Sequence, residues 1–174
     1  MGLIRRASPV KLIIAMLTKK IDLFNKAEKI LATKFGEIDH RSGLIDFDVT
    51  DYYRGEMGDR LLRKFISFKK LILPDRLRDI KLYTNKLEKR FTHNESRELN
   101  VDPGYINEGK VVLASTKDSL QRLYLGKSVY GEVTLYLRDG EYQDFLWTYP
   151  DYKKSEYKEV FKEIRVLLRK QIGR

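Results

Sequence analysis

The densest group of polar side chains lies in residues 46–56, where four carboxylates and two tyrosines occur close together. Asp46 and Asp48 are two residues apart, so they would share one face of a β-strand. Two carboxylates this close repel each other unless a cation or a proton lies between them. With Asp51 or Glu56 as a third oxygen ligand, the segment could bind a divalent metal, Mg²⁺ or Mn²⁺.

The alternative for Asp46 and Asp48 is that both simply face solvent on an edge strand, and we favour it for this pair. Asp51, Tyr53 and Glu56 are harder to explain by packing, because they lie in a loop that contains a glycine. We therefore predict Asp51 and Glu56 as metal ligands and catalytic acids, and Tyr53 as a residue that contacts a small ligand.

A carboxylate also lies in the middle of an apolar strand pattern, Tyr130-Gly-Glu-Val-Thr-Leu. A carboxylate in such a strand needs a cationic partner, which Lys117 or Arg122 could supply. Glu132 is therefore either half of a structural ion pair or a site residue. In the second case we expect Glu132 to act as acid or base and Lys117 to pair with an anionic group of the substrate.

Two more segments complete the candidate site. Asp102-Pro103-Gly104-Tyr105 is either a plain tight turn or part of a pocket, with Asp102 and Tyr105 as ligand contacts. Trp147 is the only tryptophan and begins the aromatic segment Trp-Thr-Tyr-Pro-Asp-Tyr. Such a segment covers the edge of a core or forms the wall of a pocket.

A resemblance to nucleotide-binding motifs fails on inspection. Gly126-Lys127-Ser128 matches the end of a phosphate-binding P-loop, but Gln121 occupies the position of its first glycine. The residues that follow alternate between apolar and polar like a strand, whereas a P-loop leads into a helix. Ser115-Thr116-Lys117-Asp118 lacks the second aspartate of a guanine-reading loop. Classical P-loop GTP binding is therefore disfavoured.

Composition limits the remaining classes of function. The 174 residues contain no cysteine, which excludes disulfides and cysteine-ligated zinc. The longest apolar run, residues 12–17, is far shorter than the roughly 20 residues of a membrane span. The net charge is +10, and lysine and arginine concentrate in residues 60–91 and 153–174. We expect a basic cytoplasmic protein that does not enter membranes.

The elements that must position these residues follow from periodicity. The sequence predicts one α+β domain over residues 1–174, with a mixed or antiparallel sheet covered by helices. Its first half has the ferredoxin-like order β-α-β-β-α-β, and a hairpin at residues 138–141 and a C-terminal helix follow. Residues 107–117 fit either a helix or a strand, and the pattern favours a helix beginning at Asn107.

Several blocks resemble one known family in the same order along nearly the whole chain: Asn100-Val-Asp-Pro-Gly-Tyr-Ile, Lys110-Val-Val-Leu-Ala-Ser-Thr-Lys-Asp, Arg122-Leu-Tyr-Leu-Gly-Lys, Tyr130-Gly-Glu-Val-Thr-Leu and Trp147-Thr-Tyr-Pro-Asp-Tyr. They are similar to domain of unknown function 4416, an uncharacterised prokaryotic family. The resemblance implies no established activity, although some members carry a GTP-binding label.

The leading hypothesis is a pocket for a small ligand or a divalent metal, lined by the acids and aromatic residues named above. The alternative is an RNA-binding or ribosome-associated module that uses the basic helices 74–91 and 155–174. A third hypothesis is an oligomer whose tyrosines form a protein interface. No sequence feature decides among them.

Overall fold

The apolar run near the N-terminus forms the central strand of the sheet. β1 (Lys11–Thr18) is buried along its whole length in the computed structural model, which describes residues 2–94 and 96–173. It pairs on one side with β4 (Leu61–Phe68) and on the other with β7 (Asn100–Ile106), antiparallel to both. A strand that is buried on both faces and paired on both edges explains why this run is continuously apolar.

The first half has the predicted ferredoxin-like order. α1 (Ile21–Phe35) follows β1, and α3 (Leu77–Lys89) follows β4 after a 3₁₀ turn, η1 (Pro74–Arg76). β2 (Ile38–Arg41) and β3 (Ile45–Phe47) both pair with β4 and together take the place of one edge strand. Three short elements are added to this order: α2 (Arg54–Met57), β5 (Thr92–His93) and β6 (Ser96–Arg97).

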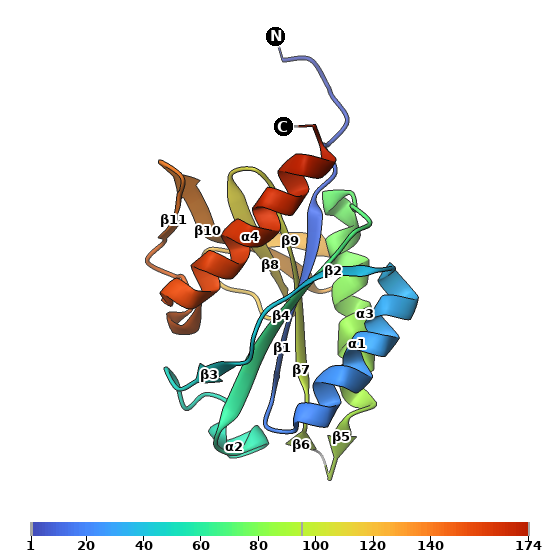
Figure 1. Ribbon diagram of the computed structural model, residues 1–174, viewed down its shortest axis with the longest axis vertical. Coiled ribbons are helices and arrows are strands. Elements are labelled where there is room, and N and C mark those ends of the chain that lie inside the picture. The colour runs from blue at the N-terminus through green and yellow to red at the C-terminus, as the bar shows by residue number, and fades with distance from the viewer. Residues whose placement is uncertain (1, 95, 174) are drawn as a thin grey trace.

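The second half extends the same sheet from β7. β8 (Lys110–Ser115) and β10 (Val129–Arg138) follow, with β11 (Glu141–Asp144) and β9 (Leu123–Gly126) both paired to β10. The nine strands form one sheet in the order β11-β10-β8-β7-β1-β4-β2, with β3 and β9 as additional partners (Figure 1). The strand pairings among the described residues of this sheet are antiparallel and helices pack on it, so the predicted α+β class is confirmed.

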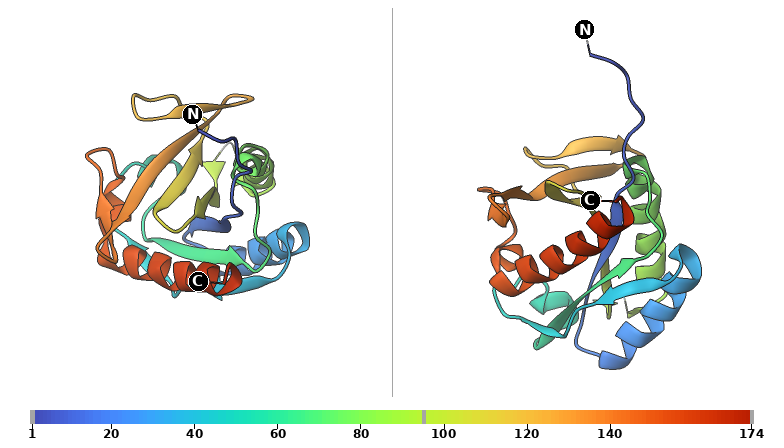
Figure 2. Two further views of the ribbon diagram at one scale, coloured as in Figure 1. Left: turned by 90° about the horizontal axis from the view of Figure 1, so that it is seen from above. Right: turned by 45° about the horizontal axis from the view of Figure 1, so that its top comes forward.

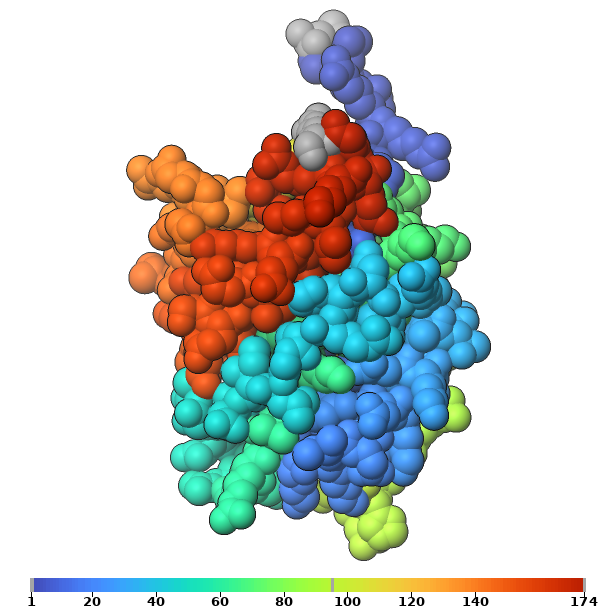
Figure 3. Space-filling view, viewed as in Figure 1, coloured from blue at the N-terminus to red at the C-terminus, as the bar shows by residue number. Residues whose placement is uncertain are grey.

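Helices cover both faces of the sheet. Leu12, Ile14 and Met16 point to the face covered by α1 and α3, where they form one apolar cluster. Ile13 and Ala15 point to the other face, which α4 (Ser155–Gln171) covers (Figure 2). The alternation along β1 follows from the period of two in a strand. Residues 2–9 are exposed and project away from this body (Figure 3).

The predicted helix over residues 107–117 is wrong, because this segment contains β8. Asn107 does not cap a helix. Its side-chain oxygen accepts hydrogen bonds from the backbone N–H groups of Gly109 and Lys110, at 2.9 and 2.8 Å. These bonds close a tight turn between β7 and β8, and the apolar run Val111–Ala114 is buried in the sheet.

The predicted turn at Asp102–Tyr105 is also wrong, because these residues lie inside β7. β7 pairs with β8 only from Gly104 to Ile106, although β8 continues to Ser115. Pro103 has no backbone N–H to donate and lies just beyond the last pair. On the N-terminal side of Gly104, β7 therefore separates from β8, and the space between the two strands opens.

No helix in the described ranges is long and apolar enough to span a lipid bilayer. Gly126 ends β9, Lys127 and Ser128 form the turn to β10, and a strand therefore follows the three residues, as predicted. The hairpin predicted at residues 138–141 joins β10 to β11 and is confirmed. The prediction of a single domain over residues 1–174 stays a prediction.

Candidate functional site

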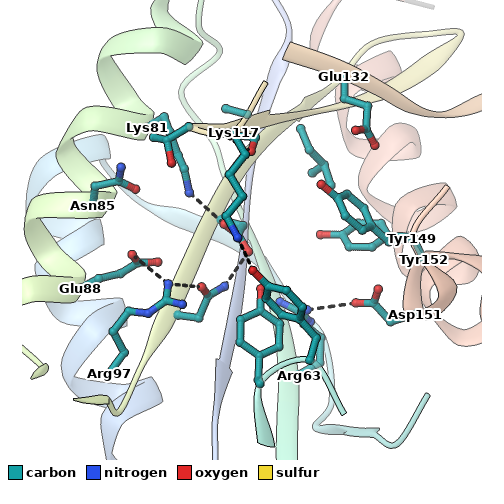
Figure 4. Close-up of a pocket in the computed structure, with 18 of the residues that line it drawn as sticks. Arg63, Lys81, Asn85, Glu88, Arg97, Lys117, Glu132, Tyr149, Asp151 and Tyr152 are labelled. Atoms are coloured by element: carbon teal, nitrogen blue, oxygen red, sulfur yellow. Dashed lines mark hydrogen bonds and ion pairs between the residues drawn. The ribbon is translucent and has the colours of Figure 1, made fainter. Parts of the chain in front are cut away.

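A pocket of about 670 Å³ opens where β7 and β8 separate. α3 forms one wall, the ends of β7 and β8 form the back, and residues 149–152 form the opposite wall (Figure 4). Ten charged side chains line it, six cationic and four acidic: Arg63, Lys81, Lys89, Arg97, Lys117 and Arg122 against Glu88, Asp102, Glu132 and Asp151.

An ion pair lies at the base of the pocket, between strand β4 and η2 (Pro150–Lys153). Nη2 of Arg63 donates a hydrogen bond to Oδ2 of Asp151 at 3.0 Å, and both side chains are less than 10% exposed. Nε and Nη1 of Arg63 are buried and have no hydrogen-bond partner among the described residues. Burial raises the pKa of Tyr157 to about 12 while Arg63 lowers it, so this hydroxyl lies near the guanidinium.

A second pair joins α3 to β7. Nζ of Lys81 donates to Oδ1 of Asp102 at 2.9 Å, and Nδ2 of Asn100 donates to Oδ2 at 2.5 Å. Burial alone would raise the pKa of Asp102. The positive charges of Lys81 and Arg63, together with the hydrogen bonds that Asp102 accepts, lower this pKa by more than burial raises it, so the net shift is downward. Asp102 is therefore a fixed anion whose two oxygens are both occupied.

A third group connects α3, β6 and α2 through Glu88, Arg97 and Glu56. Oε1 of Glu88 accepts the backbone N–H of Val101 at 2.6 Å, and Oε2 lies 3.5 Å from Nη1 of Arg97. Arg97 also binds both oxygens of Glu56, at 2.6 and 2.8 Å. These bonds to Arg97 lower the pKa of Glu56. Burial dominates at Glu88 and raises its pKa.

The raised pKa of Glu88 predicts a pH-dependent effect of Glu88→Gln. A carboxyl whose pKa is raised in the folded protein stabilises the fold at low pH, and this stabilisation is lost as pH rises above 4.5, the ordinary pKa of a glutamate. Glutamine keeps the acceptor for Val101 without the charge, so we expect a higher melting temperature for the variant at pH 7.5. This gain should disappear as pH falls below 4.5. Melting curves from pH 4 to 8 measure it.

The control for this experiment is Glu98→Gln. Lys20 donates to Glu98 and lowers the pKa of that carboxyl, so its charge favours folding. The control should lose a little stability at neutral pH, the opposite sign. A lower melting temperature for Glu88→Gln at pH 7.5 would contradict the prediction.

The upper part of the pocket is formed by β10 and the segment after β8. Nε of Arg122 donates to Oε2 of Glu132 at 2.9 Å, and Nη2 of Arg122 donates to the hydroxyl of Tyr149. The ion pair that the sequence offered for Glu132 is therefore made with Arg122 and not with Lys117. Lys117 instead extends across the opening and donates to the hydroxyl of Tyr52 (Figure 4).

Four of the cations also lie over aromatic rings. The distances from cation to ring centroid range from 4.9 to 6.0 Å. The pairs are Arg63 with Phe47, Arg97 with Tyr53, Lys117 with Tyr52 and Arg122 with Tyr149. Such contacts hold long basic side chains in place, so the pocket presents its charges in defined positions.

The structure brings together four of the eight predicted site residues: Tyr53, Asp102, Lys117 and Glu132 line this pocket. The other four lie outside its lining. Trp147 is 42% exposed, stacks on Phe145 and donates to the carbonyl of Val133. Tyr105 packs against an apolar cluster that includes Leu77 and Val112 and is not part of the lining. Glu56 supports the pocket only through Arg97.

The structure does not form the predicted Mg²⁺ or Mn²⁺ site at Asp51 and Glu56. Asp51 is exposed, pairs with Arg54 and lines a separate hollow together with Asp46 and Asp48. Both oxygens of Glu56 are bound by Arg97. Within residues 2–94 and 96–173, no group of three or more His, Cys, Asp or Glu side chains could hold a metal ion.

Sequence reasoning missed Arg63 and Lys81, although a signal was present for each. Arg63 shares its strand face with Leu61 and Phe65, both buried, and therefore points into the interior. Lys81 lies four residues after Leu77, on the buried face of α3. A cation at a core position of a regular pattern indicates either a buried ion pair or a site.

The basic helices proposed for RNA binding use many of their charges within the protein. On α4, Lys158 pairs with Asp144, Lys162 pairs with Glu141, and Arg165 donates to the carbonyl of Glu108. On α3, Lys81 points into the pocket. RNA binding through these helices stays a prediction.

The comparison with known proteins agrees with the resemblance noted in the sequence. A family model described as a domain of unknown function, DUF4416, matches residues 8–167. The chain matches no curated protein and no solved structure.

Proposed function

Since this chain belongs to the family DUF4416, whose description names no activity, we propose from the pocket itself that the protein binds a small organic anion between α3, β7 and β8. The observation that carries the proposal is the excess of cations in the lining, six against four acids.

The four acids of the pocket are already neutralised by neighbouring cations. Their partners are Lys81, Arg97, Arg122 and Arg63, and Arg97 is shared between Glu88 and Glu56, which lies outside the lining. Lys89 and Lys117 remain, and neither pairs with a carboxylate among the described residues. An anion would therefore enter a region of positive potential, where it replaces water around two lysines that pair with none of the described carboxylates.

Arg63 supports the same proposal at the base of the pocket. A guanidinium has five N–H donors in a planar fork that matches a carboxylate or a phosphate. Asp151 takes one nitrogen, while Nε and Nη1 donate no hydrogen bond within the described protein, and the nearby hydroxyl of Tyr157 is also without a partner there. Unsatisfied buried donors cost free energy, and an oxyanion that reached them would recover it.

The organic part of the ligand is inferred from the aromatic lining. Phe47, Tyr52, Tyr53, Tyr149 and Tyr152 contribute to the walls. Ligand pockets of about this volume combine mostly apolar and aromatic walls with a few polar groups that fix orientation. The proposal is therefore an organic molecule with an acidic group, and not a free inorganic ion.

The test is binding of benzoate and phenyl phosphate, measured by isothermal titration and by melting curves. A probe at 100 times its Kd stabilises the folded protein by about 2.7 kcal/mol. Lys117→Met is expected to weaken binding about threefold to tenfold, because it removes one unpaired cation at the opening. Lys29→Met on α1, an exposed lysine that does not line the pocket, is the matched control and should bind like the wild type.

Two outcomes would count against the proposal. One is that neither probe binds at millimolar concentration. The other is that Lys117→Met and Lys29→Met bind both probes equally well. Binding of single-stranded RNA with a steep dependence on salt, in the absence of probe binding, would favour the RNA hypothesis instead.

A further inference from the structure

Glu132 has a buried carboxylate oxygen that the protein leaves without a partner. Oε2 accepts two hydrogen bonds, from Nε2 of Gln121 at 3.0 Å and from Nε of Arg122 at 2.9 Å. Oε1 is buried and accepts none from the described residues. The whole side chain is 2% exposed, and its carboxylate points down toward Tyr149 and the middle of the pocket (Figure 4).

An unpaired carboxylate oxygen differs in kind from the unpaired donors on Arg63. The pair Glu132–Arg122 is neutral, as is the pair Arg63–Asp151. Each pair leaves one type of group free: an acceptor on Glu132 and donors on Arg63. Buried polar groups in folded proteins nearly always have partners, so both ends of this pocket lack a complementary group.

Aromatic side chains connect these two ends. The hydroxyl of Tyr149 accepts from Arg122, next to Glu132. The ring of Tyr149 lies 6.1 Å from the ring of Tyr152, and Tyr152 follows Asp151, the partner of Arg63. The two unsatisfied groups therefore lie at the two ends of one aromatic wall, a surface on which a flat ligand would stack.

Resting on the proposed function, we infer that Oε1 of Glu132 accepts a hydrogen bond from an N–H group of the ligand. The ligand class is then an aromatic acid, carboxylate or phosphate ester, that also carries an amino group. Its oxyanion is bound by the cations of the pocket and its amino group by Glu132. Glu132 is thus a specificity-determining residue, since it separates amino-bearing anions from otherwise equal ones.

The experiment uses two matched pairs of probes: benzoate with 4-aminobenzoate, and phenyl phosphate with 4-aminophenyl phosphate. In the wild type, the amino member of at least one pair should bind with at least about tenfold higher affinity than its partner. A hydrogen bond to a buried charged group contributes enough binding free energy for such a difference. Comparing the two pairs distinguishes a carboxylate ligand from a phosphate ester.

Glu132→Gln should abolish this preference. Gln121 and Arg122 both donate to the position of Oε2, so the amide oxygen of the variant would turn to them. Its NH₂ group would then replace Oε1 and face the amino group of the probe, donor against donor. Glu37→Gln is the matched control, because Glu37 is an exposed acid in the connection between α1 and β2. This variant should keep the preference for the amino-bearing probes.

Failure of the inference can be separated from failure of the proposed function. If all four probes bind the wild type and the amino group does not change the affinity, Glu132 accepts no hydrogen bond from the ligand. The proposal that the pocket binds an organic anion would then still be supported. If none of the four binds, the pocket proposal itself fails. The wild-type comparison needs no variant, so it holds even if Glu132→Gln does not fold.

Discussion

Replacing Arg63 with methionine is expected to lower the free energy of unfolding by about 3–5 kcal/mol. The substitution leaves the carboxylate of Asp151 buried without its cation, and removal of one partner from a buried pair is far more costly than removal of both. For a chain of this size each kcal/mol shifts the melting temperature by about 2–4 °C. Denaturation in urea measures the loss directly.

A second substitution should recover part of this loss. Arg63→Met combined with Asp151→Asn removes both charges, so the double variant should be more stable than Arg63→Met alone. Lys69→Met is the control: its pair with Glu37 is exposed on both sides, and such pairs contribute about 0–1 kcal/mol. If Arg63→Met and Lys69→Met lower the free energy of unfolding equally, the buried ion pair contributes no more to stability than an exposed one.

The pH dependence of the Arg63 variant has a definite sign. Burial raises the pKa of Asp151 even when Arg63 is present, and loss of the arginine should raise it further. A carboxyl with a raised pKa destabilises the fold at high pH, and protonation relieves this as pH falls. The deficit of Arg63→Met should therefore shrink between pH 7 and pH 4.

Gly104→Ala is expected to lower the free energy of unfolding by about 3 kcal/mol. A Cβ atom at this position would lie 2.5 Å from the carbonyl oxygen of Val112 and 2.7 Å from Cδ2 of Leu113. Gly104 is the first residue of β7, in chain order, that pairs with β8, so the backbone of β8 cannot move away without breaking the ladder. The melting temperature should fall by about 6–12 °C.

The matched control is Gly109→Ala, in the turn between β7 and β8, where an added Cβ meets nothing within 4 Å. It should change the stability by less than about 0.5 kcal/mol. The comparison also tests the structure of residues 102–105. If they formed an exposed turn, as the sequence suggested, Gly104→Ala and Gly109→Ala would have similar small effects.

Four ion pairs around one hollow are unusual as a means of stabilising a fold. Taking a charge out of water costs several kcal/mol, and a well-packed apolar pair of similar volume is often at least as stable. Arg63–Asp151, Lys81–Asp102, Arg97–Glu88 and Arg122–Glu132 nevertheless surround the same pocket. A binding site that needs fixed charges at defined positions explains this arrangement better than stability does.

Local pattern determined most of the elements of this protein from the sequence alone. Alternation and helical spacing depend on neighbours within a few residues, so they indicated β1, α1, β3, β10 and the hairpin at residues 138–141. Prediction from neighbouring residues alone failed where one short motif is compatible with two kinds of structure. Asp102-Pro-Gly-Tyr is typical of a turn, but β1 pairs with it as a strand.

Tertiary structure alone decided the site. Arg63 and Asp151 are 88 residues apart in sequence, and Glu56 and Arg97 are 41 apart. These pairs form because antiparallel strands place distant segments side by side and because β7 separates from β8 on the N-terminal side of Gly104. Asp51 and Glu56, only five residues apart, bind different arginines. Proximity in sequence sets which elements form, whereas strand register and the point where two strands part decide which side chains meet.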